Sequence, residues 1–152
     1  MAMNQDQMHA ACALLYRHWS EGTQLEELPA DLRPKDRADA YFVQACIEDY
    51  TSQPLYGWKI AATSINGQRH IGVDGPLAGR ILAERVIPNG GVFVLGSNLM
   101  RVAELEFAFR MGQDLAPRQA PYSQDEVLAS VASLHPAIEL PDSRFAHFET
   151  AG

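Results

Sequence analysis

The 152-residue chain lacks several features that would assign it at once to a membrane, secreted or nucleic-acid-binding class. No apolar run approaches the roughly 18 residues that a membrane helix needs, and the N-terminal segment has neither the basic start nor the unbroken apolar stretch of a signal peptide. The net charge is −7, and no basic run is available to neutralise phosphates. We therefore expect a cytoplasmic protein that binds neither a membrane nor nucleic acid.

Cysteine is scarce, and the glycines do not form a nucleotide-binding motif. Cys12 and Cys46 each fall inside a helical pattern, without C-x-x-C spacing, and are predicted to be reduced packing residues. The glycines at 72, 75 and 79 are not a dinucleotide fingerprint, because no strand–GxGxxG–helix context surrounds them. Three histidines have no partner pattern and are predicted to lie at the surface: His9, His18 and His147.

The composition is that of a globular domain with a real core, since 47% of the residues are apolar and 20% are charged. Apolar periodicity predicts helices over 5–21 and 36–50, and strands with glycine-rich turns follow from about residue 56, including one strand at 91–96. A capping box that begins at Ser123 predicts a helix over 123–134, followed by a short strand. This order predicts an α+β fold, with a helical region over 1–55 and a second region over 56–152.

Two carboxylates two residues apart interrupt an otherwise strand-like run. Alternation places Glu104 and Glu106 on one face and Leu105, Phe107 and Phe109 on the other, which we expect to face the core. Neighbouring carboxylates are unfavourable unless they face water or share a cation. A solvated outer face is the simpler interpretation, because charged side chains usually lie outside.

Two other charged residues interrupt apolar strands and change the balance between these interpretations. Glu139 lies within the run from Pro136 to Leu140, and Lys59 lies between Trp58 and Ile60. Acidic residues on two strands and a lysine on a third suggest a shared polar cavity. Three carboxylates make an oxygen-only ligand set, which favours Mg²⁺ or Mn²⁺ over zinc. An E-x-E pair is common, so the spacing by itself keeps both interpretations open.

Four segments in register resemble the 2-keto-4-pentenoate hydratase and 2-oxo-3-hexenedioate decarboxylase family of the fumarylacetoacetate hydrolase superfamily. They are 57–64 (GWKIAATS), 70–76 (HIGVDGP) with Gly79, 101–109 around E-L-E, and 136–144 (PAIELPDSR). The helical start, including 40–44 (AYFVQ), is similar as well. The resemblance covers nearly the whole chain and corresponds to the N-terminal part of the family.

The resemblance implies a β-roll whose first part spans 56–152, and a divalent metal, Mg²⁺ or Mn²⁺, held by Glu104, Glu106 and Glu139. A 2-oxo acid substrate would chelate this metal, and Lys59 would lie beside it to stabilise an enolate or move a proton. The implied reaction is hydration of a 2-hydroxy-2,4-dienoate by a lyase of aromatic meta-cleavage catabolism. Decarboxylation of a 2-oxo-3-enedioate and acylpyruvate hydrolysis are the alternatives within the enzyme class.

Two departures from the family pattern keep alternatives open. Leu77 stands where some relatives carry an acid, so the proton donor is unassigned and decarboxylation stays open. Family chains usually continue for roughly another hundred residues, a fair fraction of a domain. The chain is therefore expected to be a truncated, non-catalytic member or to form a homo-oligomer whose copies complete the roll. Association with a related decarboxylase or a full-length homologue is a further expectation.

Three other residues in the matching segments are candidate substrate-binding residues: His70, Asp74 and Arg144. A histidine before a glycine turn is more often a partly exposed loop residue than a pocket residue. Aspartate at position 74 fits turn chemistry better than pocket orientation. Arg144 could hold a substrate carboxylate, or pair with Asp142 or with a neighbouring subunit.

Overall fold

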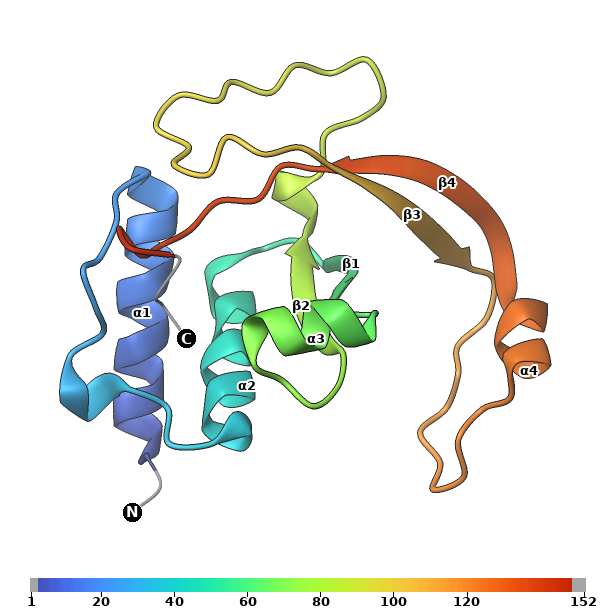
Figure 1. Ribbon diagram of the computed structural model, residues 1–152, viewed down its shortest axis with the longest axis horizontal. Coiled ribbons are helices and arrows are strands. Elements are labelled where there is room, and N and C mark those ends of the chain that lie inside the picture. Colours follow the sequence, from blue (N-terminus) through green and yellow to red (C-terminus); the bar gives the residue numbers. More distant parts are fainter. Residues whose placement is uncertain (1–2, 149–152) are drawn as a thin grey trace. The chain divides into compact units, whose positions relative to one another are not determined.

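The computed structural model describes residues 3–148, which divide into two compact units. Within the described chain, the first unit comprises residues 3–99 and 143–148, and the second comprises Met100–Asp142. Figure 1 shows helices together with two small sheets, each of two strands. The predicted α+β class is confirmed. Among the helices of residues 3–148, none is both long and apolar enough to cross a membrane.

The helices of the first unit begin and end where the sequence supplies capping groups. Helix α1 (Gln5–Glu21) starts at a capping box formed by Asn4 and Gln7, and it ends at Gly22, whose φ of 64° is left-handed. Helix α2 (Arg37–Ala45) starts at Asp36, whose side chain accepts a hydrogen bond from the Asp39 amide. The predicted helix over 36–50 is thus α-helical only to Ala45, where it tightens into the 3₁₀ helix η2 (Cys46–Tyr50).

The buried core of this unit lies between α1, α2 and η2, with both cysteines inside it as the sequence predicts. Its members are Met3, Met8, Ala11, Cys12, Val43 and Cys46. Short 3₁₀ turns, η1 (Ala30–Leu32) and η3 (Ala83–Arg85), occur in the connections. A parallel bridge between Leu25 and Phe145 joins the final segment of the described chain to the connection after α1.

The sheet of the first unit pairs β1 (Leu55–Ala61) with β2 (Leu77–Leu82) in antiparallel register. Helix α3 (Ile65–Ile71) connects them, capped by the Ser64 side chain and ended by Gly72 at a φ of 70°. The sequence analysis expected only turns here, because glycines at 67 and 72 masked a short helix. Along β1 the side chains alternate between half-buried and exposed, and Lys59 is on the half-buried side.

The second unit is a two-stranded antiparallel sheet with one short helix. Strand β3 (Glu104–Met111) pairs with β4 (Val131–Glu139), and α4 (Gln124–Ala129) lies in the connection between them. The register places Glu104 opposite Glu139 and Phe107 opposite Pro136. The alternation of faces that the sequence predicts for β3 follows from its extended backbone.

The apolar face of β3 corrects one expectation from the sequence, because it is not buried within the described chain. Leu105 is 87% exposed and Phe107 is 74% exposed. Their cross-strand neighbours complete the same face, which we call the apolar sheet face and which consists of Leu105, Phe107, Phe109, Leu134, Pro136 and Ile138. A two-stranded sheet has a core face only when another layer covers it.

Two predicted elements differ from the structure for reasons of pairing. Residues 91–96 form no strand, because no strand in residues 3–148 pairs with them. The helix expected over 123–134 ends at Ala129, because residues from Val131 onward pair with β3 instead. In both cases the secondary structure depends on whether the segment forms backbone hydrogen bonds with a distant strand, and local propensity does not specify that pairing.

We expect the carboxyl group of Glu126 to titrate near pH 2 instead of near its ordinary value of 4.5. A hydrogen bond from Arg118, supported by the Ser123 backbone and side chain, lowers the pKa of Glu126 to about 2. The stability from this contact is therefore present above pH 4.5 and is lost as the pH falls through about 2. Carboxyl chemical shifts followed by NMR across this range measure the midpoint directly.

The Arg118→Ala variant provides the control for this titration. It removes the pair to both carboxylate oxygens, at 2.9 and 2.8 Å, while the Ser123 cap remains. The midpoint should then rise toward 4.5. An unchanged midpoint in Arg118→Ala would show that the ion pair does not hold the carboxylate in its charged form.

Candidate metal centre

Three glutamates come together at one end of the β3–β4 sheet. Glu104 and Glu106 extend from the same face of β3, and Glu139 on β4 stands directly opposite Glu104. One carboxylate oxygen from each residue lies within 4.8 Å of the corresponding atoms of the other two. A pair of strands in this register therefore unites carboxylates that are separated by more than thirty residues along the chain.

The local sequence explains why these side chains can approach one another. Ala137 stands opposite Glu106, and its single methyl group leaves space beside the longer glutamate. Glu106 and Glu139 are half-buried, and Oε2 of Glu139 is shielded from solvent. Partial burial makes like charges at this separation more costly, because the surrounding dielectric is lower than that of water.

The ligand chemistry of this cluster fits a hard divalent cation. All three donors are carboxylate oxygens, the type that Mg²⁺ and Mn²⁺ prefer. Oxygens on adjacent positions of an octahedral Mg²⁺ site lie about 3 Å apart, given ligand distances of about 2.0–2.1 Å. The three oxygens, which lie within 4.8 Å of one another, would need to approach by at most about 2 Å to take adjacent positions on such an ion. Three protein ligands would leave positions for water or a chelating substrate.

The other four predicted site residues belong to the first unit. Lys59 lies in the middle of β1 opposite Gly79, and a Cβ atom at position 79 would make an ordinary van der Waals contact with the Lys59 carbonyl oxygen at 3.8 Å. His70 lies in the last turn of α3 and is exposed. All four of these residues belong to the first unit, whereas the three glutamates belong to the second.

Asp74 and Arg144 each have a partner that the sequence analysis did not identify. Arg37 forms an ion pair with Asp74 and holds the pKa of that carboxyl group below its ordinary value. The guanidinium of Arg144 lies 4.9 Å from the centre of the Trp19 ring, a cation–π distance. Both contacts join residues far apart in the sequence, so no local spacing could have indicated them.

The chain is similar to curated 2-keto-4-pentenoate hydratases over nearly its whole length. It is 31% identical, over 144 residues that cover 91% of the chain, to 2-keto-4-pentenoate hydratase 2 of Dechloromonas aromatica (strain RCB). It is 28% identical to the TodF product hydratase of Pseudomonas putida strain F1, over 91% of the chain. It is 27% identical to the 2-keto-4-pentenoate hydratase of Paraburkholderia xenovorans (strain LB400), over 95% of the chain.

The chain spans about half the length of the curated relatives it matches, between 52% and 54% in these three cases. No protein-family model matches the chain. The similarity nevertheless extends across both units and includes the strands that carry the three glutamates. The resemblance to the 2-keto-4-pentenoate hydratases that the sequence motifs indicate is thereby confirmed over nearly the whole chain.

Proposed function

We propose that this chain provides the metal-binding part of a hydro-lyase that hydrates a 2-hydroxy-2,4-dienoate in aromatic meta-cleavage catabolism. The observation that carries the proposal is the convergence of the Glu104, Glu106 and Glu139 carboxylates within 4.8 Å. The hydratase names of the relatives support the reaction class. The proposed fold is the first part of a β-roll of the fumarylacetoacetate hydrolase type.

The three glutamates would hold Mg²⁺ or Mn²⁺, which supplies Lewis-acid stabilisation of negative charge on the substrate's 2-oxygen. The three carboxylates would hold this cation at one end of the β3–β4 sheet. Water addition to a dienoate requires the substrate to be held in its keto form while a proton is moved to carbon. From the family resemblance we assign to Lys59, a half-buried residue of β1, the role of stabilising the enolate or moving its proton.

Residues with roles in substrate binding are proposed from the same matching segments. Arg144 would bind the substrate carboxylate, because a guanidinium matches that group in two-point geometry. The same resemblance makes His70 and Asp74 candidate substrate-binding residues. In that role the Asp74 carboxylate would remain ion-paired with Arg37.

A homo-oligomer is the proposed quaternary state, with a small 2-oxo acid as the binding partner of the site. The supporting observation is the apolar sheet face, which is largely exposed in the chain by itself. Apolar patches of this kind mark protein interfaces, because burying them against another surface removes them from water.

The metal site is tested by thermal unfolding with Mg²⁺, with oxalate, and with both together. Oxalate imitates the planar, chelating face of a 2-oxo acid enolate and should bind strongly only when the metal is present. A ligand at about a hundred times its dissociation constant adds about 2.7 kcal/mol to the free energy of unfolding. We expect that only the combination produces a shift of this size in the wild type.

Two variants make this measurement specific to the three-carboxylate cluster. Glu106→Ala should abolish the shift, whereas Asp114→Ala, which removes an exposed carboxylate elsewhere in the second unit, should leave it intact. With the site established, loss of the dienol's ultraviolet absorbance on addition of enzyme and Mg²⁺ measures hydration, because water addition breaks the conjugation. The proposed metal site is refuted if the wild type unfolds cooperatively and its thermal transition is unchanged by Mg²⁺ and oxalate, alone or together.

A further inference from the structure

Two pairs of potential metal ligands lie on neighbouring helical turns of the first unit, far from the three glutamates in sequence. His9 and Cys12 are three residues apart on α1, and Cys46 and Asp49 are three residues apart on η2. In a 3₁₀ helix, residues i and i+3 lie directly above one another, so Cys46 and Asp49 share a face. Packing of α1 against η2 brings the two pairs together.

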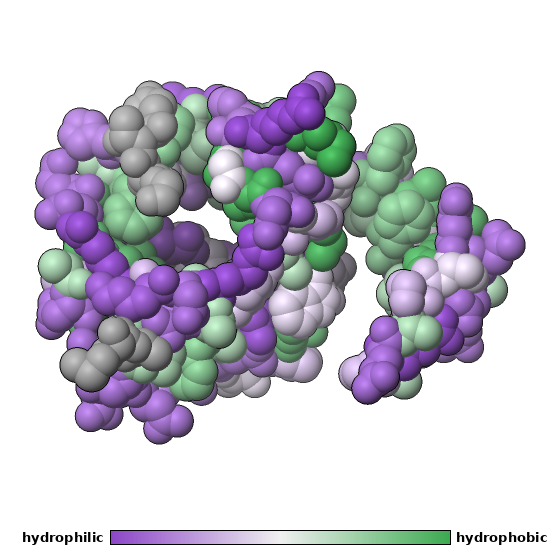
Figure 2. Space-filling view, turned by 60° about the horizontal axis from the view of Figure 1, so that its bottom comes forward, coloured by the Kyte–Doolittle hydropathy of each residue, from purple (hydrophilic) through white to green (hydrophobic). Residues whose placement is uncertain are grey.

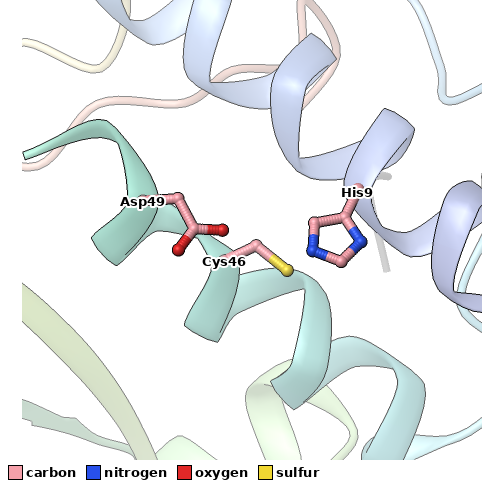
Figure 3. A group of neighbouring side chains, drawn as sticks. All are labelled: His9, Cys46 and Asp49. Atoms are coloured by element: carbon pink, nitrogen blue, oxygen red, sulfur yellow. The ribbon is translucent and has the colours of Figure 1, made fainter.

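Three different donor types converge at this contact. A ring nitrogen of His9, the sulfur of Cys46 and a carboxylate oxygen of Asp49 all lie within 4.8 Å of one another. Figure 3 shows the His9 side chain extending from α1 toward Cys46, with one ring nitrogen facing the sulfur, and Asp49 on the same side of η2. Cys46 is buried, whereas His9 and Asp49 are exposed, so the cluster is open to ions from solvent.

The tautomer of His9 is set by its other hydrogen bond. Nδ1 lies 2.8 Å from the Gln5 carbonyl oxygen, and a carbonyl can only accept, so Nδ1 carries the hydrogen. The lone pair is therefore on Nε2, the atom that a metal needs. A backbone carbonyl on the far ring nitrogen is the usual arrangement for histidines that bind metals through the near one. Phe42 packs edge-on against the ring at 5.6 Å and limits its rotation.

Cys12 lies beside the cluster on its core side without being one of its three donors. It follows His9 by three residues on α1, is 3% exposed, and belongs to the same buried core cluster as Cys46.

We propose that His9, Cys46 and Asp49 form a second metal site, selective for a thiophilic divalent cation such as Zn²⁺. The nitrogen, sulfur and oxygen donors are those that zinc prefers, in contrast to the oxygen-only set on β3 and β4. One nitrogen, one sulfur and one oxygen ligand of a tetrahedral zinc lie about 3.3–3.6 Å apart, so donors within 4.8 Å of one another would need to approach by at most about 1.5 Å. Three protein ligands leave a fourth position for water or an exogenous ligand. This site is independent of the proposed hydratase activity.

Co²⁺ is the probe that tests this site in the reduced 152-residue chain, with excess Mg²⁺ present to occupy the carboxylate cluster. A thiolate bound to Co²⁺ gives an intense near-ultraviolet charge-transfer band, which an oxygen-only site cannot produce. We expect this band to saturate at one Co²⁺ per chain and to be displaced by Zn²⁺. Loss of the band in Cys46→Ser would identify the sulfur.

Because Cys46 is buried, the exposed ligands provide variants that should retain the fold. His9→Gln and Asp49→Asn should each weaken Co²⁺ binding at least tenfold, without changing the thermal transition measured in the absence of metal. His18→Gln is the matched control, since His18 lies on the same helix but bonds to Thr23 outside the cluster. Absence of the band, its survival in Cys46→Ser, or wild-type affinity in His9→Gln would each overturn the proposal.

Discussion

Replacing Leu105 and Phe107 together with serine is expected to weaken self-association of the chain by two to four orders of magnitude. The two residues are 87% and 74% exposed, and both belong to the apolar sheet face. Burying a leucine or phenylalanine contributes about 1.5–3 kcal/mol each. Together they would contribute about 3–6 kcal/mol to an interface, and every 1.4 kcal/mol corresponds to a tenfold change in affinity.

Sedimentation equilibrium across a range of concentrations measures this association constant. Ala108→Ser is the matched control, because position 108 lies on the opposite face of the same strand and is also exposed. The control should associate as the wild type does. A monomeric wild type, or equal association of the double variant and the wild type, would contradict the role of the apolar sheet face. The result also decides between the homo-oligomer and an isolated chain.

Replacing Leu82 with alanine is expected to lower the free energy of unfolding of the first unit by about 2–5 kcal/mol. Leu82 ends β2 opposite Leu55, and its side chain is 1% exposed, the only fully buried large side chain among the described residues. The cost has two parts, because truncation loses buried apolar area and leaves a cavity that the surrounding residues fill incompletely. A loss of this size is a large fraction of the stability of a typical domain.

Urea unfolding monitored by tryptophan fluorescence isolates this effect, because both tryptophans, Trp19 and Trp58, belong to the first unit. Ile60→Ala is the comparison, since it removes a similar side chain from the paired strand at a position that is 46% exposed. Ile60→Ala should lower the free energy of unfolding clearly less than Leu82→Ala does. Equal losses in the two variants would show that burial of Leu82 does not stabilise this sheet.

The elements that sequence analysis predicted well are those whose ends are set by neighbouring residues. The capping groups at Asn4 and Gly22 bound α1, and the box at Ser123 starts α4, because a cap is a local hydrogen-bond arrangement. The alternation along β3 is also local, since it follows from strand geometry alone. The end of α4 and the missing strand at 91–96 depended on pairing partners, which no short window of sequence contains.

The candidate metal centres differ in how much of each was predictable. Glu104, Glu106 and Glu139 could be selected as candidates from sequence because each interrupts an otherwise apolar strand pattern, and the family resemblance then implied a metal-binding role for them. The cluster of His9, Cys46 and Asp49 was not predicted, and two of its members were interpreted as a surface histidine and a packing cysteine. The paired spacings H-x-x-C and C-x-x-D were the available signal, but each is too common to indicate a site without the other beside it.

The sequence by itself determined the α+β class, the resemblance to the hydratases and the choice of the three carboxylates as candidate ligands, because composition, motif order and strand alternation are properties of the linear chain. The tertiary structure alone decided that Glu139 stands opposite Glu104, that the apolar sheet face is exposed in this chain, and that α1 places His9 beside Cys46. Each of these depends on the register or packing of segments distant in sequence. Such contacts form only when burial and hydrogen bonding across the whole fold outweigh the entropy of bringing the segments together.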